Sequence, residues 1–422
     1  MSERSHRLLT DSLFFFYALF AFGSTFSIAL AQMALGVALT LFIAVILARR
    51  YNPFSSSLRW FYLFVAAYIL WMVLSALFGA SPSRSLWILK EDWLFCIVPI
   101  GVFLFSASRY RERLVLVFAA GVALVSLYGI LQHFTGVHWF KDYPCVPADD
   151  FGYRVRGNFS HRLTFGNYYG TAAAFLLGYG TLRAHQLARS QRVFFVVTGV
   201  LASIVTILSY SRGVIAGLGV ALVLLGLLLS RRHLVLILAV LLVTGATVAI
   251  VKPGLVGRYS GTASRDFDAD YEGGRLFIWK NSWEIVKNHP VLGVGAGNFE
   301  TEYASMLRPD VLGFRKHVHA HNDFFNVAAT HGVPCLALFG GLWISVLGYF
   351  FVGWRRRRAF TGEGRFFLAA LLGSVVFLFT SLTEATFADE EVRQMLMFIW
   401  AAGLWPWDAV SRQTTVLVTN KS

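Results

Sequence analysis

Four histidines fall within sixteen consecutive residues, the stretch "HVHAHNDFFNVAATHG" that begins at His317. The whole chain of 422 residues has eleven histidines, so this stretch holds a disproportionate share of them. An imidazole can bind a metal ion, take a proton from an attacking hydroxyl or donate a hydrogen bond to a phosphate. The choice among these roles depends on the element that carries each ring and on the side of a membrane that the ring faces.

The residues after His321 predict a short helix from Asn322 to His331. Asn322 or His321 can cap this helix. Gly332 and Pro334 can end it. His321 then lies at a helix N-terminus, where unpaired backbone N–H groups and the helix dipole favour an anion. A histidine in this place can act on a hydroxyl or on a phosphate. The alternative is a polar capping residue in a solvated loop.

Two groups of residues have a spacing that resembles metal sites. His317, His319 and His321 alternate, so they can share one face only in an extended chain, and the expected helix start breaks that geometry for the third. The acidic stretch "DFDAD" from Asp266 resembles the opening of a calcium loop, but Tyr271 stands where that loop needs glycine and no glutamate closes it. A solvated acidic loop is the better interpretation, and we expect neither a metal nor another cofactor.

The composition predicts a polytopic membrane protein. The chain is 56% hydrophobic and 14% charged, whereas soluble domains carry about 25% charged residues. Its net charge of +14 is therefore interpreted as membrane topology and not as nucleic-acid binding, because basic loops are retained in the cytoplasm. The first apolar stretch follows Arg4 and Arg7 and runs into further apolar spans without a small-residue cleavage site, so no signal peptide is expected.

We expect an all-α fold with about twelve transmembrane helices of ~20 largely apolar residues each, in one membrane domain over residues 1–422. The expected spans are Leu13–Ala29, Ala31–Leu47, Trp60–Phe78, Trp93–Ala107, Leu114–Gln132, Phe165–Leu182, Val193–Tyr210, Gly213–Ser230, Leu234–Val251, Pro334–Gly353, Phe366–Ala385 and Met395–Val410. With the N-terminus in the cytoplasm, every cytoplasmic segment is basic and the opposite segments are short or mixed in charge. Both termini are therefore expected in the cytoplasm.

This orientation leaves two large outer loops, residues 134–164 and residues 252–333. The longer one lies between the ninth and tenth expected spans and contains the histidine stretch, and long ordered loops are usually functional. Within it, Arg275–Asn288 has apolar residues at positions 276, 279, 283 and 286 and predicts an amphipathic helix. The histidines thus face the cell exterior or periplasm, where no ATP is available.

Arginines recur in these outer segments. Arg212 lies in "SYSRG" at the outer end of the seventh span, and Arg275 follows two glycines at the start of the amphipathic helix. Arg154 and Arg156 precede "GNF" in the other outer loop. Each alone can be a surface charge or a snorkelling side chain. Together they favour an anionic lipid headgroup at the outer face, because the planar guanidinium fits phosphate oxygens.

The stretches "GGRLFIWKNSWEIVKNHPVLGVGAGNFE" and "HAHNDFFNVAATHGV" resemble the signature region of the O-antigen ligase and polymerase superfamily. The family pattern of His, then Asn, Ser or Gln, then nine residues and Gly is met by His321, Asn322 and Gly332. Cys335 stands where Gly, Thr or Tyr is expected, at a helix-packing position that bears little on chemistry. The resemblance implies a bacterial inner-membrane glycosyltransferase of GT-C-like fold, with about a dozen spans and a large periplasmic loop.

The resemblance further implies a reaction and its residues. The ligase moves a completed O-antigen glycan from undecaprenyl diphosphate to a sugar hydroxyl on lipid A–core, with inversion at the anomeric carbon and without a metal. The essential histidine of the family falls on His321, and its two essential arginines fall on Arg212 and Arg275. Whether His321 acts as a base or binds the diphosphate stays open. The implied partners are the lipid-linked donor, lipid A–core and membrane lipids, with no nucleic acid.

We expect Arg154 and Arg156 to add to diphosphate binding, and Asn322 and His319 to support His321. Three other functions are compatible with parts of this pattern. An O-antigen polymerase uses the same donor with a second lipid-linked glycan as acceptor, and a protein O-oligosaccharyltransferase uses serine or threonine. A transporter would place ionisable residues near the bilayer midplane and show paired repeats, whereas Arg212 lies at the outer boundary and no repeat is detected.

Overall fold

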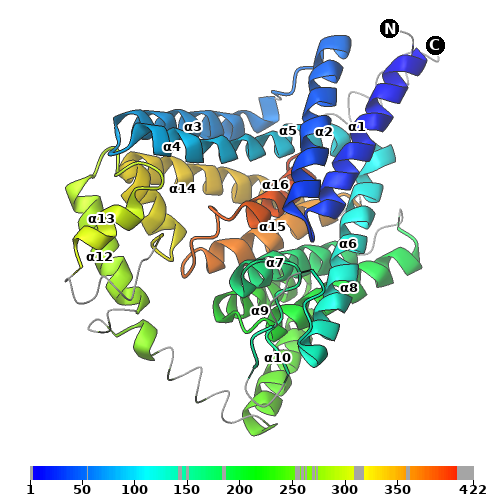
Figure 1. The fold of residues 1–422 in the computed structure, drawn as a ribbon. Helices are drawn as coiled ribbons and strands as arrows, with labels where there is room; N and C mark the ends of the chain where they lie inside the picture. Colours follow the sequence, from blue (N-terminus) through cyan, green and yellow to red (C-terminus); the bar gives the residue numbers. More distant parts are fainter. Residues whose placement is uncertain are drawn as a thin grey trace.

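The computed structural model describes residues 3–54, 56–140, 145–148, 152–182, 187–251, 257, 261, 264–268, 271, 274–307, 318–357 and 362–405. Within these residues the fold is all-α, with 15 α-helices (Figure 1). They are α1 (Glu3–Gly23), α2 (Ile28–Arg49), α3 (Arg59–Phe78), α4 (Pro82–Leu89), α5 (Ile97–Ser106), α6 (Ser108–Thr135), α7 (Arg162–Thr181), α8 (Arg189–Leu208), α9 (Arg212–Leu229), α10 (Arg231–Val251), α12 (Arg275–Asn288), α13 (Phe299–Ser305), α14 (Asp323–Arg357), α15 (Gly364–Thr380) and α16 (Glu390–Leu404). The short 3-10 helices η1 (Ser56–Leu58) and η2 (Lys90–Cys96) precede α3 and α5.

The protein is a multi-pass membrane protein. Each of the twelve expected spans overlaps a helix, and within the described residues 6 helices are long and apolar enough to cross a membrane. These are Ile28–Arg49, Ser56–Phe78, Ser108–Thr135, Arg189–Leu208, Arg212–Leu229 and Asp323–Arg356. The polytopic class is confirmed, and the count of twelve crossings stays a prediction.

Two expected span boundaries are wrong. The helix within Leu13–Ala29 ends at Gly23, and the helix within Phe366–Ala385 ends at Thr380. Past both ends the sequence mixes polar and apolar residues, "STFSIA" after Gly23 and "SLTEA" after Thr380, so hydrophobicity alone could not locate the turn. The second correction matters for function, because Glu384 then lies in a loop and not inside a span.

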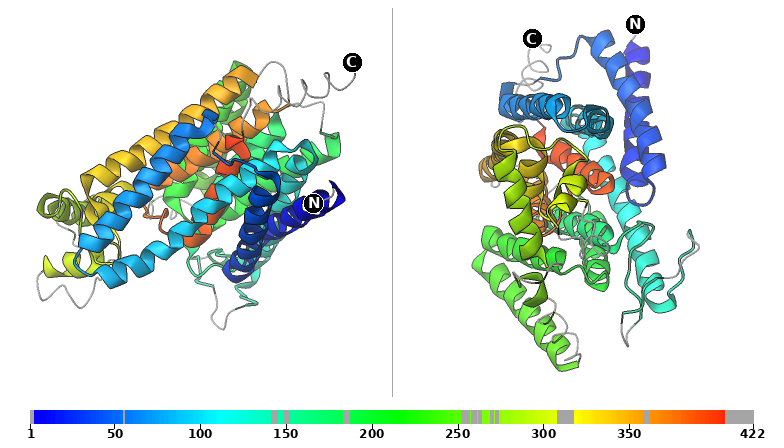
Figure 2. Two further views of the ribbon diagram at one scale, coloured as in Figure 1. Left: turned by 90° about the horizontal axis from the view of Figure 1, so that it is seen from above. Right: turned by 60° about the vertical axis from the view of Figure 1, so that its left-hand side comes forward.

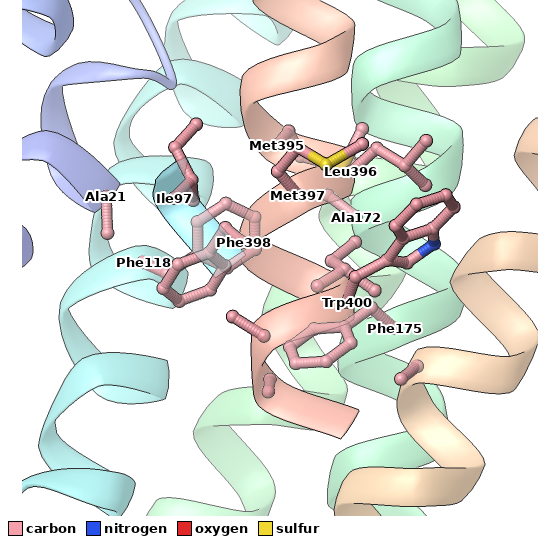
Figure 3. Packing of buried hydrophobic residues seen from close by; sticks show 14 of the residues in the cluster. Ala21, Ile97, Phe118, Ala172, Phe175, Met395, Leu396, Met397, Phe398 and Trp400 are labelled. Atoms are coloured by element: carbon pink, nitrogen blue, oxygen red, sulfur yellow. The ribbon is translucent and has the colours of Figure 1, made fainter. Parts of the chain in front are cut away.

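The centre of the bundle is α16, which is buried along its whole length from Val392 to Leu404. Figure 3 shows Phe398 of α16 against Phe118 of α6, and their ring centroids lie 4.9 Å apart. A helix that is apolar on every side must be enclosed by other helices. The loop between α15 and α16, residues 381–389, therefore starts and ends on enclosed helices and has a fixed position.

One end of the bundle collects the elements of the long outer loop. α12 and α13 lie beside the ends of α3 and α4 and the beginning of α14, far from the start of α1 (Figure 1). Seen from above, α3 and α14 run side by side (Figure 2). The predicted amphipathic helix has the bounds of α12, Arg275–Asn288. All candidate residues of the long loop that the structure describes thus lie at this end.

The predicted apolar face of α12 is wrong in part. Val286 of that face is buried, but Leu276 is 36% and Trp283 51% exposed. The helix also buries Ile278, Ser282 and Ile285. The buried residues pack with Phe299 and Tyr303 of α13 and with Ala328 and Ala329 of α14. The apolar pattern of α12 therefore did not fully identify its packing face, because Ser282 is buried and two large apolar residues are not.

Candidate active site

α14 consists of two helices separated at Gly332. This residue has φ 83° and ψ 169°, which no helix contains, and Pro334 follows it. A Cβ at Gly332 would lie 1.9 Å from the carbonyl oxygen of Val291. Only glycine fits both the positive φ and this close approach. The short helix expected to end at His331 is therefore confirmed.

The glycine-rich turn 291–298 holds the broken helix in place. The backbone N–H of Val294 donates to the oxygen of Ala329 at 3.0 Å, and that of Gly295 donates to Thr330 at 2.8 Å. Helix carbonyls that lose their partners at a break must find others when they are buried. The turn supplies those partners, which fixes the short helix and the residues at its start.

Asn322 is the N-cap of the short helix. Its Oδ1 accepts from the backbone N–H groups of Phe324 at 2.9 Å and Phe325 at 3.0 Å. Its Nδ2 donates to the oxygen of Leu382 at 2.9 Å, which ties the helix start to the loop after α15. Since Asn322 caps the helix, His321 does not. His321 instead has a φ of 48°, in the left-handed region that costs free energy and often marks functional sites.

A continuous set of charged contacts joins both arginines to His321. Arg212 Nη2 and Arg275 Nη1 donate to the same oxygen of Asp266, at 2.8 Å and 2.7 Å. Arg275 Nη2 donates to Glu384 Oε1 at 2.5 Å. The other oxygen of Glu384 lies 3.1 Å from His321 Nδ1. We call these five residues the arginine–histidine cluster.

Three helix N-termini meet at this cluster. Arg212 and Arg275 are the first residues of α9 and α12, and His321 lies two residues before α14. Gly213 permits the approach of α9, because a Cβ there would lie 2.6 Å from Thr383 Oγ1. Helix N-termini carry partial positive charge and unpaired N–H groups. Their convergence adds to the positive potential of the two guanidinium groups and favours an anion.

The carboxylates of the cluster lie deeper than its cations and its imidazole. The side chain of Glu384 is 9% exposed, whereas those of His321 and Arg212 are 28% and 32% exposed. Burial by itself raises the pKa of the Glu384 carboxyl, but the hydrogen bond with His321 and the charge of Arg275 outweigh burial, so the pKa lies below its usual value. Glu384 is thus ionised at neutral pH. Its contact with Nδ1 orients the ring of His321.

The comparison with protein families agrees with this geometry. Residues 197–340 match the model of a family described as O-antigen ligase. This segment is an O-antigen ligase family domain. Members of this family are lipid-linked glycan transferases, with activity of the O-antigen ligase and polymerase type. No curated protein sequence matches the chain significantly. The family domain includes Arg212, Arg275 and His321 but ends before Glu384.

The other histidines near His321 differ in what they contact. The ring centroids of His319 and His321 lie 4.4 Å apart, and His319 Nδ1 accepts from the backbone N–H of His321 at 3.3 Å. His319 therefore positions His321. His331 is buried and its Nδ1 lies 3.1 Å from Ser75 Oγ, so it joins the short helix to α3. His317 lies outside the described residues.

The two arginines of the smaller outer loop lie outside the arginine–histidine cluster. Arg156 Nη1 donates to the oxygen of Ser160 at 3.4 Å, and a side-chain hydrogen bond joins it to Cys145. Within the described residues, no ion pair or hydrogen bond joins Arg154 to the cluster. Their part in diphosphate binding stays a prediction.

Three residues near the site were missed or misjudged from sequence. Glu384 falls inside an expected span, where a carboxylate is itself a signal of function. Asp266 falls in the stretch expected to be a solvated acidic loop, but it is the shared partner of two arginines. The third is His161, whose pKa is lowered first by burial and then by the charge of Arg162, while Glu384 raises it. No sequence motif marks His161.

In the described part of the chain, no three His, Cys, Asp or Glu residues form a group that could hold a metal ion.

Proposed function

We propose that the protein is an O-antigen ligase, which transfers an O-antigen glycan from undecaprenyl diphosphate to a sugar hydroxyl of lipid A–core. The reaction takes place at the periplasmic face of the bacterial inner membrane, inverts the anomeric carbon and needs no metal. One observation carries this proposal: Arg212, Arg275 and His321 meet at three converging helix N-termini. The family domain supports a lipid-linked glycan as the donor.

The arginines bind the diphosphate of the donor in this proposal. Arg212 and Arg275 already share one carboxylate oxygen of Asp266, so both guanidinium groups are directed at a single anionic point. Phosphate oxygens suit the same donors, and a diphosphate leaving group gains negative charge as its bond to the sugar breaks. Each such donor contributes about 2.7–4 kcal/mol of transition-state stabilisation by the standard of oxyanion sites. Two arginines thus neutralise the leaving group.

His321 acts on the acceptor. The acceptor hydroxyl oxygen attacks the anomeric carbon from the face opposite the diphosphate, a new carbon–oxygen bond forms, and the bond to the phosphate oxygen breaks. The hydroxyl proton passes to Nε2 of His321, while Glu384 holds Nδ1. General-base assistance of this kind typically contributes ~10²–10⁴-fold in rate. Glu384 also stabilises the imidazolium that results, because it is ionised and buried beside it.

Reconstitution with defined substrates tests the function. The full-length protein in liposomes receives a lipid-linked O-antigen donor together with either lipid A–core or a second lipid-linked glycan, and the products are separated by gel electrophoresis. We expect glycan on lipid A–core and no lengthening of the lipid-linked glycan. Lengthening of the lipid-linked glycan alone would identify a polymerase. Transfer to neither acceptor would refute the proposal.

A further inference from the structure

A cavity adjoins the segment that carries His321. It has a volume of about 290 Å³ and lies between α3, η2, the glycine-rich turn, the short helix of α14 and the loop before α16. We call it the acidic pocket. The polar and aromatic residues of its wall include Asp92, His319, Asp323, Asn326, Phe387 and Arg393. The arginine–histidine cluster accounts for the donor diphosphate and gives this pocket no role.

The acidic pocket is more negative than the cluster, in which the carboxylates of Asp266 and Glu384 balance the two guanidinium groups. Glu91, Asp92 and Asp323 line it with a single basic side chain, Arg393. Arg393 Nη1 donates to Asp92 Oδ1 at 2.7 Å, and Nη2 donates to the backbone oxygen of Glu91 at 3.3 Å. The one guanidinium of the wall is thus bound to the wall itself. A phosphate would meet carboxylates here and be repelled.

The remaining groups of the wall suit a neutral sugar. Asn326 uses Oδ1 to accept from the backbone N–H of Ala320, so its Nδ2 can donate to a ligand. Carboxylate oxygens accept hydrogen bonds from hydroxyls, and Asp92 uses Oδ1 for Arg393. Phe299 and Phe387 add buried aromatic surface. Apolar walls with a few placed polar groups are typical of small-molecule sites, and 290 Å³ is near the lower limit of their usual ~300–1,000 Å³.

The acidic pocket adjoins His321. Its wall contains His319 and Asp323, which flank His321 on both sides in the chain. The ring of His319 lies 4.4 Å from that of His321, centroid to centroid. A hydroxyl bound at the His319 edge of the pocket therefore lies near His321. The diphosphate is held by other residues of the cluster, Arg212 and Arg275, which do not line the pocket.

We propose that the acidic pocket binds the accepting sugar, and that this sugar is a neutral ring whose hydroxyls carry no phosphate. The inference rests on the proposed function and adds to it a subsite and a specificity. Donor and acceptor are then sorted by charge, because the guanidinium side attracts the diphosphate and the carboxylate side excludes it.

A blocking variant tests the location. Ala388 is exposed, lies on the pocket wall and offers no side-chain hydrogen bond to lose, so Ala388→Trp fills the pocket. Leu86→Trp is the matched control, since Leu86 is 42% exposed on α4 and is not part of the wall. With full-length protein in liposomes, we expect Ala388→Trp to raise the KM for lipid A–core at least tenfold and to change the KM for the lipid-linked donor less than twofold. The control should match the wild type. An unchanged KM for lipid A–core would overturn the pocket assignment.

A competition assay on the wild-type protein tests the specificity without any variant. Soluble core oligosaccharide competes with lipid A–core, either with an unmodified accepting sugar or with the same sugar phosphorylated. We expect the neutral form to inhibit at a concentration at least tenfold lower. Equal or stronger inhibition by the phosphorylated form would overturn the inference. Absence of transfer by the wild type would instead refute the proposed function, so the two failures are distinct.

Discussion

Two of the regions that contain arginine–carboxylate pairs differ in the exposure of their arginines. In one region Arg111 binds Glu363 and Arg365 binds Glu112, and the side chains of Arg111 and Arg365 are 7% and 0% exposed. The other region is the arginine–histidine cluster, in which the side chains of Arg212 and Arg275 are 32% and 22% exposed.

The two regions also differ in the side chains that surround their arginines. The guanidinium of Arg111 lies 4.0 Å from the ring centroid of Trp405, and that of Arg365 lies 5.0 Å from Tyr179. Aromatic rings lie against these cations, which have almost no access to solvent. The cluster cations instead lie beside an imidazole and retain access to solvent. Ion pairs of the same chemical type therefore hold helices together where they are enclosed. In the cluster, where the arginines are partly exposed, the guanidinium groups remain accessible to a ligand.

The largest effect is expected at the imidazole. His321→Ala should lower glycan transfer by about 10²–10⁴-fold, because the acceptor hydroxyl loses its base. The free energy of unfolding should fall by about 1.5–3 kcal/mol, because the hydrogen bond to the ionised Glu384 is lost. Transfer to lipid A–core and thermal unfolding in detergent measure the two quantities. Transfer at the wild-type rate would remove His321 from the chemistry.

Arg275→Lys retains the charge of the cluster but removes the planar fork. We expect transfer to fall by about 10²-fold, because lysine cannot contact Asp266, Glu384 and a phosphate together. Arg84→Lys, on an exposed arginine of α4, is the control and should be silent. Equal rates in both variants would show that charge alone suffices at position 275.

The enclosed pairs should respond in the opposite way. Arg365→Met removes the ion-pair partner of Glu112, which keeps the hydrogen bond from the Tyr179 hydroxyl. The free energy of unfolding should fall by about 3 kcal/mol, near the lower end for broken buried pairs, because the side chain of Glu112 is 26% exposed. Arg355→Met, on an exposed arginine of α14, should change it by less than about 0.5 kcal/mol. Folded Arg365→Met protein should keep its transfer rate per molecule. A selective loss of transfer would contradict the comparison.

Glu384 gives the smallest expected change, in the acid dependence of stability. Its pKa is lowered in the folded protein, so the stabilisation from its contacts is complete above the usual glutamate range and is lost as the pH falls below that range. Glu384→Gln lacks this titration. Unfolding midpoints measured from pH 7 to pH 3 should therefore fall less steeply for the variant than for the wild type. Parallel curves would mean that the contacts of Glu384 contribute nothing to folding.

Local signals in the sequence determined much of the fold. Hydrophobic runs predicted a polytopic membrane protein, and the position of Asn322 and Gly332 predicted the short helix between them. The bounds of α12 were also predicted correctly. These features depend on interactions over one or two helical turns, such as capping and periodic burial, which neighbouring residues reveal.

The tertiary structure alone decided how the candidate site is completed. The contact of Arg212 with Asp266 spans 54 positions, that of His321 with Glu384 spans 63, and that of Arg275 with Glu384 spans 109. No local pattern records which carboxylate meets which cation. The same holds for the acidic pocket, whose wall comes from five separate segments. Residue types along the chain specified the chemistry that was available, and helix packing determined which of those groups meet.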